Sequence, residues 1–284
     1  MTKLTVQTID QVIEVIASKS SVDLDLTRVD FIDPYALLLL VLALRRRKNL
    51  GKSLHVWWPA RKDVLGWMRA MGFFGEINDP KPTRRSEASS KSDALQPITH
   101  IIGEEEVSHL VNAFDKRLTN RYPLTDESRN ALVKVMFELF QNIPQHSNAT
   151  GEVTNPHGLA AMQDYADSIF LAVADMGIGL CKSLSTREGF VDLSDASALN
   201  RIVYDGMSRF SDPGRGGELR RIASLVRRWD GLLAIRSGEA LLYMDAERGD
   251  IYDAPCFPGV QIGVSLPRRV FGIDSPTVDK EAFL

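Results

Sequence analysis

Residues 168–180 read SIFLAVADMGIGL, and this stretch decides the fold. The first seven residues are mostly apolar and β-prone, which predicts a buried strand. Asp175 stands at the end of that strand, and Gly177 and Gly179 follow it. Two glycines spaced two apart let the backbone approach a ligand closely. The aspartate could then accept a hydrogen bond from an exocyclic amine, although the same pattern also occurs in ordinary tight turns.

A helix is predicted upstream of this strand, over residues 126–146, with Thr125 at its N-cap. Glu138 and Asn142 lie one turn apart on it, and His146 lies near its end. A carboxylate can deprotonate an attacking water or hydroxyl, and an amide oxygen is a hard ligand of the kind that Mg²⁺ accepts. A polar helix face that makes only surface hydrogen bonds would show the same pair, and a histidine at a helix end can be structural. The apolar stripe of the helix consists of Leu132, Val135, Met136, Leu139 and Ile143.

A glycine cluster follows about 35 residues after the strand, at residues 214–217, and precedes an amphipathic helix. Free N–H groups at such a helix start favour anions, so Gly214, Gly216 and Gly217 could surround phosphates. A glycine-rich turn is weak evidence when it stands alone.

Together, in this order and spacing, the three elements resemble the N, G1 and G2 boxes of the GHKL (histidine-kinase-like, Bergerat-fold) ATPases, over about residues 120–268. The end of the chain fits, with an expected hairpin of residues 232–235 and 241–244 around Ser237-Gly238 and a closing strand at 260–266. The resemblance implies a two-layer α/β sandwich with helices on one face of an antiparallel or mixed sheet. It also implies that the ligands are ATP and Mg²⁺.

The resemblance gives each site residue an expected role. Glu138 corresponds to the general base, Asn142 to the magnesium ligand, and Asp175 to the residue that binds the adenine amino group. Gly177 and Gly179 correspond to the glycines on the adenine side of the pocket.

The phosphate side is expected to consist of Gly214, Gly216 and Gly217, under a lid of about residues 183–215. Arg209 and Arg215 in the lid are candidates for contact with the γ-phosphate, and His146 is a further binding candidate. Two residues depart from the family pattern. Pro144 removes a helix hydrogen bond beside Asn142, and Glu218 replaces a common glycine, so binding is a safer prediction than fast hydrolysis.

The preceding part of the chain forms a separate predicted unit, residues 1–78, joined by a linker or long loop at 79–97 to the ATP-binding unit at 98–284. Asp33-Pro34 is a strong helix start, and Gly51 ends that helix. Strands are expected at 4–6, 22–26 and 53–58, helices at 10–18, 34–49 and 61–71, and a loop at 29–33.

Residues 3–76 resemble a STAS domain, the fold of anti-sigma-factor antagonists. The signalling members of that family carry a phosphorylated serine or threonine after the aspartate at this helix start. Here Pro34 follows Asp33, so no phosphoswitch carries over. The unit is expected to act as a docking or packing domain.

Composition narrows the class of protein further. The chain has 284 residues, a net charge of −3 and two cysteines, which suits a reducing compartment and gives no general signal for nucleic acid. Its longest apolar run, residues 35–44, is about half of a membrane span, and the N-terminus lacks a signal peptide, so a cytoplasmic protein without membrane contact is expected. The basic clusters at 45–48 and at Arg220, Arg221, Arg227 and Arg228 are interpreted as solvated helix faces, with nucleic acid as the lesser alternative.

These observations favour an ATP/Mg-binding regulatory protein in bacterial partner-switching-type regulation, acting as a slow ATPase or a protein serine/threonine kinase. The alternative is a non-catalytic module whose lid closure controls a protein partner of unknown identity. A complete sensor kinase is excluded, because no helical hairpin with a phosphoacceptor motif is found. An expected helix at 103–119 carries an apolar stripe that packs within the chain or, less favoured, forms a homodimer.

Overall fold

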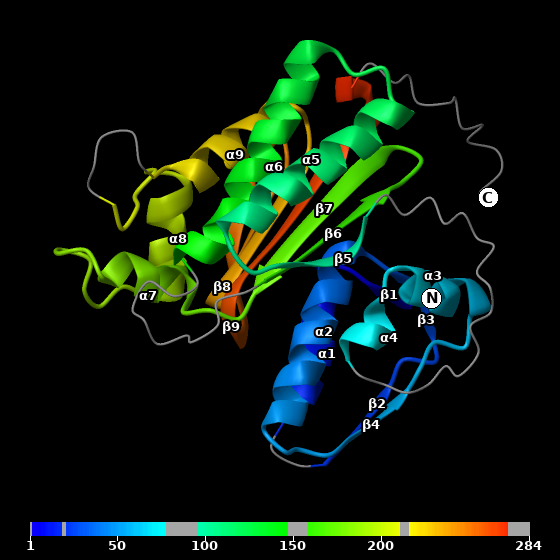
Figure 1. Cartoon of the computed structure of the whole chain (residues 1–284). Helices are drawn as coiled ribbons and strands as arrows, with labels where there is room; N and C mark the ends of the chain where they lie inside the picture. Colours follow the sequence, from blue (N-terminus) through cyan, green and yellow to red (C-terminus); the bar gives the residue numbers. More distant parts are fainter. Residues whose placement is uncertain (1, 19–20, 78–95, 147–157, 211–215, 272–284) are drawn as a thin grey trace.

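The computed structural model of the chain describes residues 2–18, 21–77, 96–146, 158–210 and 216–271, and the fold is mixed α/β. Figure 1 shows a smaller N-terminal unit below and a larger unit above, in which helices cover a sheet. The described residues form two hydrophobic cores: one lies between the sheet and the helices of the larger unit, and the other lies between the sheet and the N-terminal unit.

The N-terminal unit alternates strands and helices, as predicted, and pairs its strands in parallel, β1 with β3 and β2 with β4. Residues 29–32, expected in a loop, instead form β3, because Val29 and Ile32 are buried against the unit's core and the segment pairs with β1. A short helix at 73–76 was not predicted. In chain order the elements are β1 (Thr2–Leu4), α1 (Ile9–Ala17), β2 (Val22–Asp25), β3 (Val29–Ile32), α2 (Pro34–Asn49), β4 (Leu54–Trp57), α3 (Lys62–Ala70) and α4 (Phe73–Glu76).

Helix α2 starts where the sequence predicts. The Asp33 carboxylate accepts hydrogen bonds from the backbone N–H of Ala36 at 2.7 Å and of Val6 at 3.2 Å. The helix is apolar around its whole circumference, since every residue from 37 to 41 is fully buried. Such a helix needs apolar partners on more than one side.

Within the described residues, five strands form the sheet of the larger unit in the order β5-β6-β7-β9-β8, and all neighbours are antiparallel. Residues 96 and 97, expected in the linker, open the first of these strands. The expected hairpin around Ser237-Gly238 is wrong: β8 runs on through these residues, which form a bulge, and pairs with a 19-residue β9. The strands are β5 (Gln96–Ile101), β6 (Gly158–Asp164), β7 (Ser168–Asp175), β8 (Leu232–Met244) and β9 (Gly249–Pro267).

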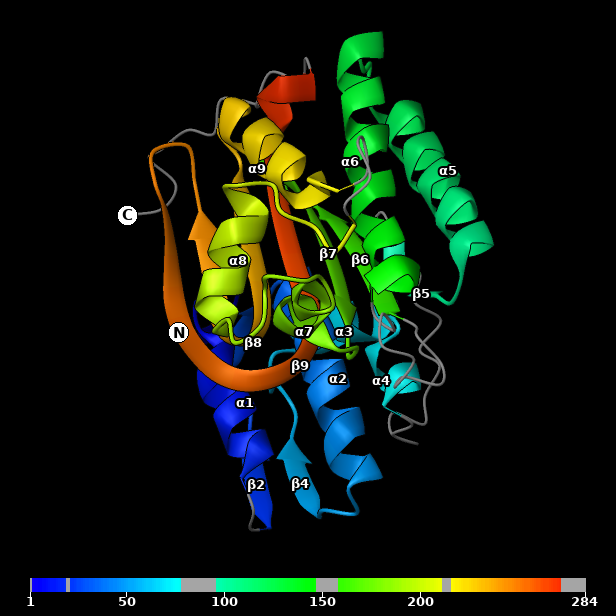
Figure 2. The same cartoon turned by 90° about the vertical axis from the view of Figure 1, so that its left-hand side faces the viewer.

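Helices cover one face of this sheet (Figure 2). The predicted apolar stripe of residues 126–146 is buried there, and the stripe of the 103–119 helix packs into the same core, which confirms packing within the chain. The elements of this layer are α5 (Glu104–Arg121), α6 (Asp126–His146), α7 (Gly179–Ser185), α8 (Asp195–Val203), α9 (Glu218–Arg228) and the 3₁₀ helix η1 (Arg268–Phe271).

The opposite face of the sheet packs on α2, so the sheet lies between two layers of helices, whereas a two-layer sandwich was expected. Ala161, Ala172 and Ala174 point to this side, and their small side chains let the helix come close. At Gly263, a Cβ atom would stand only 3.2 Å from the Tyr35 ring. Successive residues of a strand point to opposite faces of the sheet, so the same strands contribute apolar side chains to both cores.

Polar contacts also join the units. The Trp67 indole N–H donates to Gln163 Oε1 at 2.8 Å, and the fully buried Arg236 on β8 forms an ion pair with Asp10 on α1. The basic run at 45–48 is not simply solvated, because Arg47 is buried and donates to the carbonyl oxygens of Ile16 and Ser53. No helix in the described part of the chain is long and apolar enough to cross a membrane.

Candidate functional site

Glu138 and Asn142 lie on α6 beside its apolar stripe, one turn apart. The Asn142 amide donates to the backbone oxygen of Glu138 at 2.8 Å, which fixes the amide and leaves its Oδ1 for another partner. The Glu138 side chain is only 9% exposed, and its Oε2 is buried without a hydrogen-bond partner among the described residues. A buried carboxylate oxygen without a partner is costly, so it marks a place where a proton or a donor could be accommodated.

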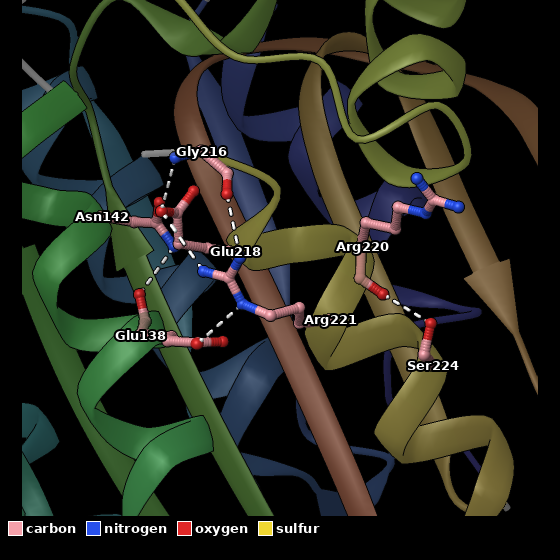
Figure 3. Close-up of polar contacts among 7 residues, drawn as sticks. All are labelled: Glu138, Asn142, Gly216, Glu218, Arg220, Arg221 and Ser224. Carbon is pink, nitrogen blue, oxygen red and sulfur yellow. Dashed lines mark hydrogen bonds and ion pairs between the residues drawn. The ribbon is translucent and has the colours of Figure 1, made fainter. Parts of the chain in front are cut away.

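Arg221 on α9 faces Glu138 and makes three contacts (Figure 3). Its Nε donates to Glu138 Oε1 at 3.0 Å, its Nη1 donates to the carbonyl oxygen of Gly216 at 2.9 Å, and its Nη2 lies 3.5 Å from Glu218 Oε1. Arg221 is exposed, as a solvated face predicts, but it also pairs with Glu138 and Glu218, which that interpretation did not include. The sequence does place it in the first turn of α9, but only the crossing of α9 over α6 brings it to Glu138.

The glycine loop before α9 is described from Gly216 onwards, whereas Gly214 and Arg215 lie outside the described residues. Both Gly216 and Gly217 have positive φ angles, 96° and 75°, which favour glycine. The Glu218 side chain points back to this loop, and its Oε1 accepts a hydrogen bond from the Gly216 N–H at 3.0 Å. A carboxylate thus takes a donor that phosphate would need.

Asp175, the last residue of β7, is buried at the other end of the site. Its Oδ1 accepts from the N–H of Gly177 at 2.7 Å and of Val260 at 3.4 Å, and its Oδ2 takes part in neither bond. Burial raises the pKa of Asp175 to about 6, because desolvation outweighs the two backbone hydrogen bonds. Gly179, with φ at 79°, begins α7 directly beyond this aspartate.

Two residues of β9 that the sequence analysis missed hold Asp175 in place. Gln261 is fully buried and donates to the Asp175 carbonyl oxygen at 2.9 Å. A Cβ atom at Gly259 would stand 2.3 Å from that same oxygen, so the close approach of the two strands requires glycine there. Both lie more than 80 positions from Asp175, and no local pattern in the sequence points to them.

Two small cavities link these groups. The first, about 20 Å³, is lined by Asn142 and Asp175 among others, and the second, about 30 Å³, by Asn142, Gly217 and Glu218. Both also border Leu180 and Leu219, so the two cavities are neighbours. We call them together the path, and polar groups from three segments line it. Each cavity holds about one water, whereas ligand pockets usually have 300–1,000 Å³, so a ligand of nucleotide size requires the path to widen.

Part of the expected lid packs into the fold, since helix α8 is buried through Ala198 and Leu199. Just before the lid, Ser237 accepts a hydrogen bond from the backbone N–H of Leu180 at 2.8 Å, which ties α7 to β8. Of the expected lid arginines, Arg209 lines the second cavity, with its guanidinium 4.3 Å from the centre of the Phe210 ring. Helix α6 continues past Asn142 to His146, whose side chain lies outside the described residues.

Comparison of the sequence with models of known protein families finds no match. Comparison with curated proteins finds none either.

Proposed function

We propose that the larger unit binds ATP with Mg²⁺ along the path from Asp175 to the Gly216-Gly217 loop, as a Bergerat-type domain preceded by a STAS-like domain. The observation that carries the proposal is the convergence of the three predicted sequence elements. Asn142 borders both cavities, Asp175 lies at one end, and Gly217 lies at the other. Segments far apart in the sequence would have no reason to meet in this order if each were an isolated turn or surface face.

The Asp175 end suits an adenine ring. Its Oδ2 can accept a hydrogen bond from the exocyclic amine, since Oδ1 is already taken by two backbone groups. Val173 and Ile262 supply apolar walls for the faces of the ring. A mostly apolar cavity with a few directed polar groups is the usual composition of a small-ligand site.

The other end suits phosphates and a metal. The Gly216 N–H and the Arg221 guanidinium are both donors, and both now contact the Glu218 carboxylate, which occupies the place of an anion. Mg²⁺, when bound, neutralises part of the phosphate charge. Asn142 Oδ1 is the oxygen that would hold it, because the amide nitrogen is engaged with the backbone of Glu138.

In this proposal Glu138 acts as the general base. Arg221 holds Oε1, while Oε2 can take the proton of an attacking oxygen. That oxygen bonds to the terminal phosphorus as the bond to the ADP oxygen breaks. Attack by water gives a slow ATPase, and attack by a hydroxyl of a protein partner gives a serine/threonine kinase in partner-switching regulation.

A second candidate is a nucleotide-dependent interaction module without useful turnover. The Arg221–Glu138 ion pair favours it, since the guanidinium already occupies one of the two carboxylate oxygens. In that case binding of ATP would alter a partner surface without hydrolysis.

Calorimetric titration with Mg-ATP tests the site, and phosphate release tests catalysis. Asp175→Asn should weaken ATP binding at least about tenfold, because it replaces an acceptor in the adenine slot by a group with a donor. Asp167→Asn, at the exposed position just before β7, is the matched control and should bind like wild type. Unchanged affinity in Asp175→Asn would refute the site.

Glu138→Ala should retain ATP binding and lose phosphate release, while Glu127→Ala, at the exposed start of α6, should retain both. Binding without turnover in wild type and in Glu138→Ala alike would leave the interaction module as the function.

A further inference from the structure

A concave surface of about 590 Å³ lies between α6 and α9, beside the candidate nucleotide site. We call it the basic groove, because its lining includes Lys134 on α6 and Arg220, Arg221 and Arg228 on α9. Gly206 and Gly217 form part of its floor, where the absence of side chains leaves space. The Arg220 stem passes over Gly206, since a Cβ atom there would stand 2.9 Å from Arg220 Cδ.

The cations of the groove are mostly uncompensated. Arg221 pairs with Glu138 and Glu218, but Lys134, Arg220 and Arg228 form no ion pair with any residue that the structure describes. All of these side chains are exposed. Figure 3 shows the Arg220 guanidinium pointing away from Glu138, whereas Arg221 turns towards it.

This concentration of charge is local. The whole chain has a net charge of −3, so a basic groove is not a consequence of a basic protein. Arg221, Ser224 and Arg228 recur at spacings of three and four, which aligns them along one side of α9. Like charges held along a concave surface repel one another and raise the local concentration of anions.

We propose that the basic groove binds an acidic segment of a partner protein, a short stretch of aspartate, glutamate or phosphorylated side chains. The size of the groove supports a short segment, because α9 has 11 residues and spans about 16 Å. A carboxylate flanks it as well: Glu127 lies two turns before Lys134 on the same side of α6. A nucleic-acid backbone that continued past the groove at this end would meet this negative charge, whereas a short acidic segment ends before it.

The groove borders the candidate site through Arg221, which reaches Glu138 from the groove side. A docked segment would therefore lie next to the carboxylate that could act as base. The position of the segment next to Glu138 has a catalytic consequence only if the proposed function holds. Binding of an acidic segment does not depend on it, because none of the three unpaired cations contacts the nucleotide path.

The test uses the full chain without nucleotide and a fluorescent peptide of about ten glutamates, titrated at low and at moderate salt. Wild type should bind the peptide, and salt should weaken the binding. Lys134→Glu and Arg228→Glu should each weaken it about tenfold at low salt, since each reverses one charge of the groove. Arg227→Glu is the matched control: it makes the same change at the adjacent exposed position outside the groove lining and should bind like wild type.

Three results would overturn the proposal. The first is absence of peptide binding at low salt, and the second is an equal loss of peptide affinity in Arg227→Glu and Arg228→Glu. The third is that a single-stranded oligonucleotide of the same charge binds more tightly than the peptide and that Lys134→Glu and Arg228→Glu weaken its binding. Thermal unfolding by circular dichroism shows whether the variants fold. ATP affinity in Arg228→Glu, measured in parallel, should match wild type. If ATP does not bind but the peptide does, the proposed function fails and the groove stands.

Discussion

Replacing Glu218 by glutamine should increase the affinity of the chain for ATP. The carboxylate of Glu218 accepts the Gly216 N–H at 3.0 Å and lies 3.5 Å from the Arg221 guanidinium, so it occupies the donors that a phosphate would use. Glutamine has the same shape and keeps an acceptor oxygen for the Gly216 N–H. The substitution therefore removes the negative charge while it preserves the loop.

The size of the effect follows from Coulomb's law. A phosphate that takes the Gly216 N–H would stand about 5 Å from the displaced carboxylate, and two unit charges at that distance repel by about 0.8 kcal/mol in water and by more near a protein surface, where the effective dielectric constant is lower. Removing the charge should therefore tighten ATP binding by about 1–2 kcal/mol, or about 5- to 30-fold.

Titration calorimetry with Mg-ATP and with adenosine measures this effect. Adenosine carries no phosphate, so its affinity should be the same in wild type and in Glu218→Gln. Glu239→Gln, an exposed carboxylate on β8, is the charge-matched control and should leave ATP affinity unchanged. Weaker ATP binding in Glu218→Gln would refute the reasoning, and an equal gain for adenosine would show that the substitution acts through conformation instead of charge.

Three further outcomes are expected. Because burial raises the pKa of Asp175 to about 6, calorimetry should show ATP affinity falling as the pH is lowered from about 7 to about 5, and this part of the pH dependence should vanish in Asp175→Asn. Burial raises the pKa of Asp33 to about 7, so between about pH 4 and pH 7 the folded state keeps a proton that the unfolded state has lost, and the free energy of unfolding falls as the pH rises. In urea unfolding, Asp33→Asn should therefore raise the free energy of unfolding by up to about 4 kcal/mol at about pH 8 and by little at about pH 4. Gly259→Ala should lose more than about 2 kcal/mol against the Asp175 carbonyl in the same assay, whereas Gly51→Ala, also at positive φ but with open space around it, should lose about 1 kcal/mol.

Local patterns in the sequence predicted the elements that carry the candidate site. The stripe of α6, the buried strand β7 and the cap at Asp33 depend on neighbours a few residues away, and the structure places them as expected. Glu138, Asn142 and Asp175 follow from these elements, because their positions on a helix face and at a strand end are local properties.

The rest depends on contacts across the fold. Arg221 reads as one more charge on an amphipathic helix until α9 is placed against α6, and Gln261 reads as one polar residue in a strand until β9 pairs with β7. The hairpin prediction failed for a similar reason: Ser237-Gly238 resembles a turn, but its partners in β9 extend the strand beyond it. A turn-forming pair specifies a turn only where the flanking residues lack a better pairing.

The packing of α2 on two sides is also indicated by the sequence. A helix without a polar side cannot lie on the surface of a small domain, so residues 37–41 already required a second packing partner. That partner is the back of the sheet, reached through Ala172 and Ala174 on β7. The same strand ends in Asp175. Val173 and Asp175, on the face of β7 opposite Ala172 and Ala174, line the first cavity. Alternate residues of β7 therefore contact α2 on one face and line the candidate site on the other. Because protein interiors are closely packed, the contact of the N-terminal unit with β7 helps to set the position of Asp175.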